Sequence, residues 1–370
     1  MIKSIILSFV FFAITLGSYS QSTYTVTTTG TTVPMDAAIN YTTNIWAQYL
    51  NSSVPIKLNV VYTDLTAGGP LAVTFPNGIK DFSGASITGA WYATCLANAI
   101  TGTELNPGEF DMDIYVNSAI DYYFGIDGNP GINQYDFVSI FLHEMSHGLG
   151  TGSISKIDAG VGSFGLLDST SVAPFSTSFP FPDLNGLPSV WDTYLINGTG
   201  QQLADTLIFP NISTALGNEL ESNAIFFSGS NATAANGGSV PKIFAPTTYE
   251  DGSSLQHFDE TTFPNSSGNS LLTPYFYNNE VEHNPGTLLK GALRDIGWNV
   301  NNVGISKSVI APKVSVYPNP TTDQLNFNIE ALMDGQFTLE VFDLAGRIIY
   351  RSIIQTNSHQ VDVSSFADGV

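Results

Sequence analysis

Three stretches before residue 120 carry hydrophobic patterns that predict regular structure. Residues 35–50 place apolar and aromatic side chains at helical spacing, which predicts an amphipathic helix. Residues 56–65 (IKLNVVYTDL) are rich in β-branched side chains and end in a turn signal, and residues 110–118 (FDMDIYVNS) alternate apolar and polar positions. Both of these stretches predict strands. A helix and strands in this order predict an α+β fold.

Residues 135–150 (YDFVSIFLHEMSHGLG) predict a helix with two different faces. At about 100° per residue, an apolar stripe runs along one side, and His143, Glu144 and His147 fall on the opposite side. Asp136 can cap the start of this helix, and two glycines can end it. Aliphatic and aromatic neighbours flank the polar trio, so we expect its face to line a cleft.

The pattern changes twice in the second half of the chain. Residues from about 151 to 250 are rich in Gly, Ser, Asn, Thr and Pro, which predicts a loop-rich insertion, and helical spacing returns at 285–298. We therefore expect one domain over 21–303. A linker at 304–313 would join it to 314–370, where short alternating stretches separated by turn residues predict a small β-sandwich.

The N-terminus and the composition indicate an exported chain. Residues 1–20 have a lysine, a short apolar run and a small-x-small site, which is the pattern of a signal peptide. No later segment is apolar for long enough to predict a membrane span. The net charge of -21, with only 11 Lys and Arg, argues against nucleic-acid binding. The single cysteine, Cys95, cannot form a disulfide within the chain and is expected to be a buried, inert thiol.

The pattern His143-Glu144-x-x-His147 carries the candidate chemistry. Histidines at i and i+4 lie one helical turn apart, close enough to bind one metal ion. Zinc in catalytic sites takes three protein ligands and leaves one position open, and an adjacent carboxylate can take a proton from water. Glu144 has the right place for that role. The alternative is a structural helix that contains two hydrogen-bonded histidines.

A third zinc ligand cannot be read from local spacing. The metzincin pattern HExxHxxGxxH would place a histidine at position 153, where this chain has Ser153, a poor zinc ligand. The other histidines are His257, His283 and His359, and the last of these lies in the predicted β-sandwich.

Residues 35–298 resemble a family of bacterial secreted metallopeptidases that is distantly related to the leishmanolysin-like metzincins. The resemblance rests on six runs: YDFVSIFLHEMSHGLG, LPSVWDTYL, NATAANGG, GSSLQHFDE, NSLLTPYF and HNPGTLLKGALRDIGW. It implies a zincin-like domain with a mixed sheet, in which 151–250 is the insertion that precedes the third ligand, His257. Leu272 stands where the family has the methionine of a turn beneath the zinc. Tyr275 is then either a packed aromatic residue, the favoured reading, or a residue that leans over the site.

Three further assignments stay open. The run GNELESN resembles a gluzincin signature, which would make Glu219 the third ligand, and His283 is another rival. Metzincins bind substrate along an edge strand by β-augmentation, and 110–118 is either that edge or an inner strand. The turn 125–131 (GIDGNPG) is a weak candidate for calcium without EF-hand spacing, and a plain turn is favoured.

Residues 314–370 resemble the C-terminal sorting domain of the type IX secretion system, through VYPNPTTDQLNF, VFDLAGRIIY and VDVSSFADGV. The resemblance implies that the type IX machinery is a partner and that the protein is secreted or displayed on the cell surface. The usual final strand is missing after Val370, which suggests a truncated domain.

The sequence therefore predicts a secreted zinc endopeptidase that acts on protein or peptide substrates. His143, His147 and His257 would hold Zn²⁺, and Glu144 would activate the zinc-bound water. The alternative is a catalytically silent adhesion or glycan-binding protein on a zincin scaffold. The intact Glu144 argues against this alternative, because a pure binder needs no base.

Overall fold

The computed structural model describes residues 21–167, 184–301, 313–318, 321, 323–330, 337–342, 348–354 and 358–366. The chain divides into two compact units, residues 1–302 and 303–370. The expected signal peptide (1–20), nearly all of the expected linker and the end of the chain at Val370 lie outside the described residues.

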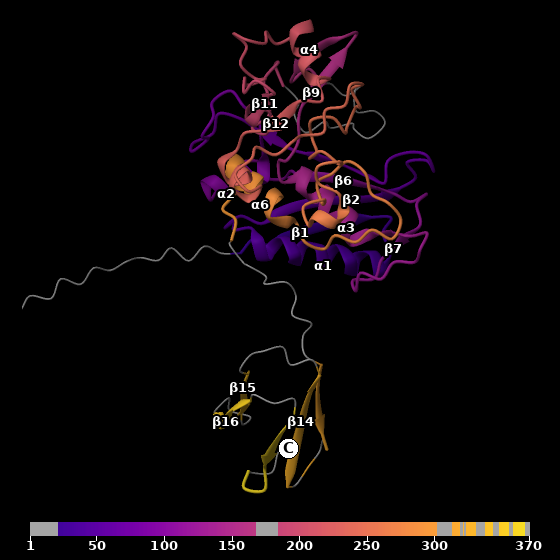
Figure 1. Ribbon diagram of the computed structural model, residues 1–370, viewed down its shortest axis with the longest axis vertical. Coiled ribbons are helices and arrows are strands. Elements are labelled where there is room, and N and C mark those ends of the chain that lie inside the picture. Colours follow the sequence, from indigo (N-terminus) through magenta and orange to yellow (C-terminus); the bar gives the residue numbers. More distant parts are fainter. Residues whose placement is uncertain are drawn as a thin grey trace, which may run out of the picture. The chain divides into compact units, whose positions relative to one another are not determined.

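A four-stranded mixed sheet forms the framework of the first unit (Figure 1). Its order is β1-β2-β6-β3; the first three strands are parallel, and β3 runs antiparallel to β6. The strands are β1 (Tyr24–Thr29), β2 (Ile56–Thr63), β3 (Ala72–Pro76) and β6 (Met112–Asn117). Hydrophobic alternation located β2 and β6 correctly, because each strand buries every second side chain against the core.

The place of residues 110–118 in the sheet decides between the two readings of this stretch. They contain β6, an inner strand between β2 and β3, so the inner-strand reading is confirmed and the reading as the substrate-binding edge is wrong. The edge beside β6 is β3. Alternation shows which face of a strand is buried, but it does not show which strands flank it.

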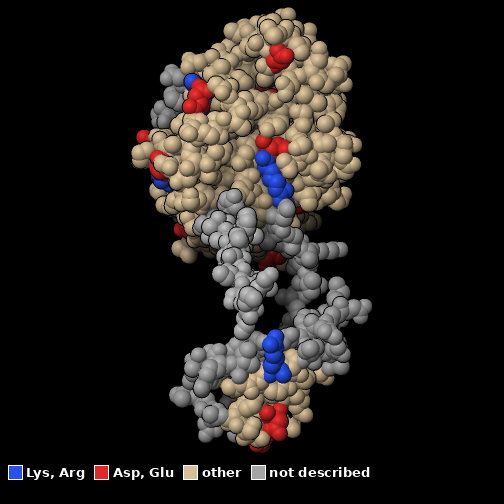
Figure 2. Space-filling view, turned by 90° about the vertical axis from the view of Figure 1, so that its left-hand side faces the viewer, with Lys and Arg blue, Asp and Glu red and all other residues tan. Residues whose placement is uncertain are grey.

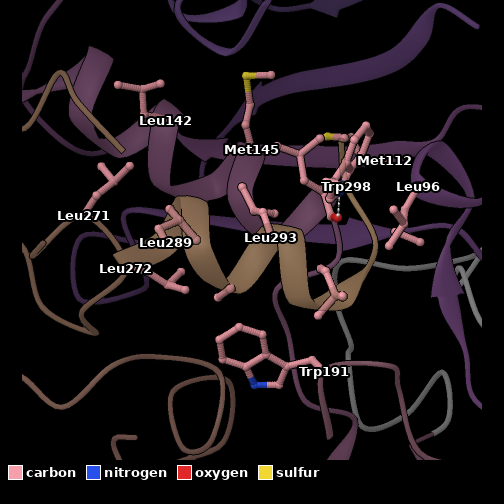
Figure 3. Close-up of a cluster of buried hydrophobic side chains, with 14 of the residues drawn as sticks. Leu96, Met112, Leu142, Met145, Trp191, Leu271, Leu272, Leu289, Leu293 and Trp298 are labelled. Carbon is pink, nitrogen blue, oxygen red and sulfur yellow. Dashed lines mark hydrogen bonds between the residues drawn. The ribbon is translucent and has the colours of Figure 1, made fainter. Parts of the chain in front are cut away.

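Four longer helices belong to the first unit: α1 (Val33–Tyr49), α2 (Thr94–Thr101), α3 (Phe137–Gly148) and α6 (Gly286–Ile296). Helix α3 contacts α1 and the strands β3 and β6. Figure 3 shows Leu142 and Met145 of α3 in one apolar cluster with Leu289 and Leu293 of α6. Burial of these side chains is the main force that holds α3 in the molecule.

Two glycines allow α3 to end against the sheet. A Cβ on Gly148 would lie 2.2 Å from the Met112 sulfur of β6, so only glycine fits this close approach. Gly150 has a φ of 105°, which residues with a side chain rarely adopt. The chain therefore turns away from the helix at the position that the sequence predicted.

Short elements fill the remainder of the first unit. Before α3 these are β4 (Gly78–Ile79), β5 (Tyr92–Ala93), β7 (Tyr122–Tyr123) and β8 (Tyr135–Asp136). Within the loop-rich region they are β9 (Ser155–Asp158), β10 (Val161–Phe164), η1 (Asp192–Tyr194), β11 (Leu195–Asn197), α4 (Thr214–Leu220), β12 (Ile225–Phe227) and α5 (Ser230–Ala235). One further turn, η2 (Asn265–Ser267), precedes α6.

The second unit consists of antiparallel strands. One sheet has the order β13-β14-β17 and the other pairs β15 with β16. Their bounds are β13 (Lys313–Tyr317), β14 (Gln324–Glu330), β15 (Phe337–Phe342), β16 (Ile348–Ile354) and β17 (Ser358–Asp362). These strands fit a small β domain.

Two expectations about the whole chain can be compared with the described residues. In the part of the chain that the structure describes, no helix has the length and apolar character needed to cross a bilayer. Cys95 is buried, its thiol donates to the Gly148 carbonyl at 3.3 Å, and burial raises its pKa. A buried thiol with a raised pKa is a weak nucleophile, as expected.

Candidate metal centre

Helix α3 presents the HExxH pattern from a fully buried position. Asp136 is the N-cap, and its Oδ2 accepts a hydrogen bond from the Ser139 backbone N–H at 2.9 Å. Every residue from Phe137 to Gly148 is buried, so the polar trio faces a cleft within the protein rather than open solvent. The i, i+4 spacing then aims His143 and His147 at the same point.

His257 reaches this point from a segment 110 residues after His147. The backbone around it is held on two sides. Phe244 N–H donates to the His257 carbonyl at 2.9 Å, and Phe258 N–H donates to the Leu272 carbonyl at 2.8 Å. His257 is 4 % exposed, and its ring lies parallel to that of His143 with centroids 5.1 Å apart.

The Nε2 atoms of the three histidines form a nearly equilateral triangle. The distances are 3.1 Å from His143 to His147, 3.2 Å from His147 to His257 and 3.2 Å from His257 to His143. In the described part of the chain, no other group of three or more His, Cys, Asp or Glu side chains is close enough to hold one ion.

Hydrogen bonds on the far side of each ring decide which nitrogen carries the proton. Nδ1 of His143 lies 2.7 Å from the Leu271 carbonyl, Nδ1 of His147 lies 2.7 Å from the Thr151 carbonyl, and Nδ1 of His257 lies 2.7 Å from the Ser253 carbonyl. A carbonyl only accepts, so each Nδ1 must donate, and each neutral ring keeps a lone pair on Nε2. The three Nε2 lone pairs face one another with no hydrogen atom between them, so they repel one another. A cation bound between them would remove this repulsion.

The electrostatic surroundings keep these rings neutral. Burial, reinforced by the charge of His147, lowers the pKa of His143 to about 3, and burial lowers that of His147 to about 4. Burial and the two neighbouring histidines also lower the pKa of His257 well below its ordinary value. Since metals bind the neutral imidazole, the cluster is ready to ligate at neutral pH without losing a proton.

Glu144 lies beside the cluster and has one anchored oxygen. Its side chain is buried, and Oε2 accepts a hydrogen bond from the Thr74 hydroxyl of β3 at 2.7 Å. Burial raises the pKa of Glu144 to about 7, against the opposing effect of the Thr74 hydrogen bond. A carboxyl group with this pKa can both accept and return a proton near neutral pH.

A cleft of about 1150 Å³ opens onto His143, Glu144, His147 and His257. One wall is the segment 69–76, which includes the edge strand β3. Residues 274–277, Tyr249 and residues 251–253 also line the cleft. Aromatic rings are frequent in this lining, so the cleft offers apolar surface beside a small polar centre.

The rival ligands lie elsewhere. Glu219, in α4, accepts a hydrogen bond from the Asn197 amide at 3.2 Å, and His283 pairs with Asp136 at 2.7 Å. Ser153 donates to the Ser155 hydroxyl, and His359 of the second unit lies 3.1 Å from the Tyr350 hydroxyl. The structure therefore brings His257, and not Glu219, His283 or His359, to His143 and His147. Ser153 lines the same cleft, and its hydroxyl is used by Ser155.

Leu272 and Tyr275, which the resemblance placed near the metal, both lie close to the cleft. Leu272 is fully buried and shares a tight turn with Leu271, whose carbonyl holds His143. Tyr275 lines the cleft, is 39 % exposed, and donates to Glu250 at 2.8 Å while its ring packs edge-on against Phe244. It is thus a cleft-wall residue rather than a fully packed one.

The candidate calcium turn uses its carboxylate within the turn. Asp127 accepts hydrogen bonds from the Tyr123 hydroxyl and the Asn129 backbone N–H, and the Tyr123 contact is the main cause that lowers its pKa. Asp127 thus has local partners that account for its position in a plain turn.

Sequence reasoning missed Thr74. The strand that carries it is short and mostly half-buried, and it was not predicted because the run 72–76 (AVTFP) has no clear alternation of apolar and polar residues. The carbonyls of Leu271, Thr151 and Ser253 were also missed, because main-chain partners leave no trace in side-chain patterns.

Comparisons with known proteins concern the C-terminal unit. Residues 315–370 match the family described as secretion system C-terminal sorting domain. No curated protein and no solved structure gave a match. The chain therefore carries a type IX sorting domain, which implies contact with the type IX secretion machinery and export to the cell surface or the medium. The matched residues do not include the three clustered histidines.

Proposed function

We propose that this protein is an exported zinc-dependent endopeptidase with a zincin-like catalytic domain. The observation that carries the proposal is the convergence of three neutral imidazole Nε2 atoms beside a buried carboxyl group, in the lining of one cleft. Four side chains would do the work: His143, His147 and His257 would hold the ion, and Glu144 would move the proton.

The donor set and its spacing fit zinc. Three nitrogens at about 2.0–2.1 Å from one tetrahedral ion lie about 3.3 Å apart. The Nε2 distances of 3.1–3.2 Å agree with that value. Three imidazoles with one open position are a usual ligand set of catalytic zinc, and the carbonyl partners on Nδ1 are the usual supporting contacts.

The protein's own part in hydrolysis is proton transfer and placement. Bound zinc would polarise the peptide carbonyl and lower the pKa of water to about 7. Glu144 would take a proton from the attacking water on the oxygen that Thr74 leaves free, and then pass it to the leaving amine. The pKa of Glu144, raised to about 7 by burial, suits both directions of this transfer.

The cleft favours an extended peptide as substrate. Thr74, the middle residue of β3, contacts Glu144. The segment from Leu71 to Pro76 lines the cleft on both sides of Thr74. An edge strand can pair with a substrate chain through its main-chain groups. Space on both sides of the reacting centre supports cleavage within a chain rather than at its end.

A catalytically silent binding protein is the other candidate. Figure 2 shows isolated acidic and basic side chains on the face it presents, rather than one continuous charged surface. Burial of a carboxyl group is costly without a function or a strong partner. Glu144 has one neutral hydroxyl as its partner, and this argues for the enzyme.

The test is Glu144→Gln, with Glu219→Gln as the matched control. Glutamine keeps the size of the side chain but cannot accept the proton, so casein hydrolysis should fall by about 10²–10⁴-fold. Zinc content per chain should stay at that of the parent. Glu219→Gln, remote from the cluster, should hydrolyse casein at the parent rate.

Two results would count against the proposal. Equal casein hydrolysis by the parent and Glu144→Gln would remove Glu144 from the reaction. No hydrolysis by the zinc-loaded parent on casein, gelatin or a mixed peptide library would favour the silent binder.

A further inference from the structure

The edge strand β3 contributes more than a wall to the site. Thr74 is the residue of this strand that faces α3, and its hydroxyl donates to Oε2 of Glu144 at 2.7 Å. The other carboxylate oxygen, Oε1, accepts no hydrogen bond from any described residue. The two oxygens of Glu144 thus have different tasks: one is held and the other is free to meet a proton.

The register of the sheet shows which face of β3 carries Thr74. Residues that lie opposite each other in antiparallel strands share a face. Ala72, Thr74 and Pro76 lie opposite Val116, Ile114 and Met112 of β6, and these three are fully buried. Met112 contacts Gly148 of α3, so this face is the one covered by the helix.

The Thr74 hydroxyl has a specific partner on this face. Thr74 is partly buried, because it lies on the helix-covered face and also lines the cleft. The partner of Thr74 is Glu144. One hydrogen bond therefore serves both residues: it gives the Thr74 hydroxyl an acceptor, and it is the only hydrogen bond that the Glu144 carboxylate accepts from the described residues.

We propose that Thr74 is a positioning residue for Glu144: its hydroxyl fixes one carboxylate oxygen, so that the other points into the cleft toward the histidine triangle. This inference rests on the proposed function for its effect on catalysis. Without the hydroxyl, the carboxylate is free to rotate about its last bond and spends less time in the reactive orientation. A small displacement of a catalytic group lowers the rate of hydrolysis strongly.

The test compares Thr74→Val with Thr74→Ser in the zinc-loaded full chain. Valine keeps the branched shape and strand preference but has no hydroxyl, and serine keeps the hydroxyl. We expect kcat on a fluorogenic peptide to fall about 10-fold in Thr74→Val, with KM within about 2-fold of the parent, and Thr74→Ser to stay within about 3-fold in both. In a Glu144→Gln background, Thr74→Val should have no further effect.

A second readout does not depend on hydrolysis. In crystal structures of the metal-free protein, the Glu144 carboxylate should keep its position in Thr74→Ser and leave it in Thr74→Val. Should Thr74→Val fold poorly, Thr74→Ala provides the same comparison with a smaller side chain.

The outcomes separate this inference from the proposed function. Parent-like kcat in Thr74→Val, equal damage in Thr74→Val and Thr74→Ser, or an unmoved carboxylate in Thr74→Val would each overturn the role of Thr74. A parent that hydrolyses no peptide would overturn the proposed function instead. The position of Glu144 in the crystal structures would then still decide whether Thr74 holds it.

Discussion

The two ends of helix α3 each hold histidines in a buried polar setting, but with opposite arrangements. At its start, His283 directs Nε2 at Oδ2 of Asp136, 2.7 Å away, and its ring packs edge-on against Tyr41. Toward its end, His143 and His147 direct Nε2 at each other and at His257. Nε2 of His283 therefore faces a hydrogen-bond acceptor, the Asp136 carboxylate. The Nε2 atoms of the other three histidines face only one another.

This difference separates the structural histidine from the candidate ligands. His283 is partly buried, with 19 % of its side chain exposed, whereas the three clustered histidines are buried. A histidine whose Nε2 meets a carboxylate already has its partner within the protein. A cluster whose Nδ1 atoms all donate and whose Nε2 lone pairs converge is completed by a cation. Four perturbations can break or sharpen this contrast, and their expected effects decrease from the first to the last.

The largest effect should come from His257→Ala compared with His283→Ala. Loss of one of three ligands should reduce bound zinc from one per chain to below about 0.1 after dialysis and abolish hydrolysis. His283→Ala should keep zinc at the parent level. Metal analysis after dialysis measures both variants. Full zinc in His257→Ala would disprove the three-histidine site, and metal loss in Glu219→Ala would then point to the gluzincin alternative.

The second effect is on the pH dependence of the metal-free protein. The pKa of His143 is lowered to about 3 and that of His147 to about 4, and that of His257 is also low. The unfolded chain, with histidine pKa values near 6.5, therefore binds up to three more protons between about pH 4 and 6.5. Stability contributed by these groups is present above that window and is lost as pH falls through it.

Glu144 has the opposite effect on the pH dependence of stability. Its pKa in the folded protein is raised to about 7, so the folded chain binds one more proton there than the unfolded chain. The net difference is up to two protons, or about 2.7 kcal/mol per pH unit. Denaturant unfolding in the presence of a chelator, at several values between pH 5 and 7, measures this slope. The triple variant His143→Ala/His147→Ala/His257→Ala should lose this positive slope, and the remaining effect of Glu144 should make its stability fall with rising pH by about 1.4 kcal/mol per pH unit. An unchanged slope in that variant would show that the three histidines are not its cause.

The third effect is a loss of stability without a loss of function. His283→Ala removes one donor to the buried carboxylate of Asp136, which keeps its hydrogen bonds to Ser139. The free energy of unfolding should fall by about 1–3 kcal/mol at pH 7. Denaturant titration measures this change, and His359→Ala, in the other unit, is the control. A loss of zinc on His283→Ala would show that the two ends of α3 are not independent.

The smallest effect on the site should come from deletion of residues 303–370. This unit contains His359, which lies beside the Tyr350 hydroxyl and is not a member of the cluster. Zinc content and hydrolysis should stay within about 2-fold of the parent, because the three histidines all belong to the first unit. The truncated chain should instead fail to reach the medium, and its normal release from the cell would contradict the sorting role of the tail.

Much of the site was predictable because it depends on local periodicity. The helix over 135–150, its cap at Asp136 and the shared face of His143 and His147 follow from a spacing of 3.6 residues per turn. The same spacing located α1, whereas β-branched composition located β2 and alternation with a period of two residues located β6. The sorting tail was readable because its turn residues and short strands recur in a known family.

Sequence alone determined the helix, the positions of His143, Glu144 and His147 on it, and the C-terminal sorting domain. Tertiary structure decided the rest of the centre. His257 joins the cluster only because the fold brings its Nε2 to 3.2 Å from those of His143 and His147, although 110 residues separate it from His147. The edge strand and Thr74 were also decided at that level, since strand order depends on the free energy of the whole sheet and not on the pattern within any one strand.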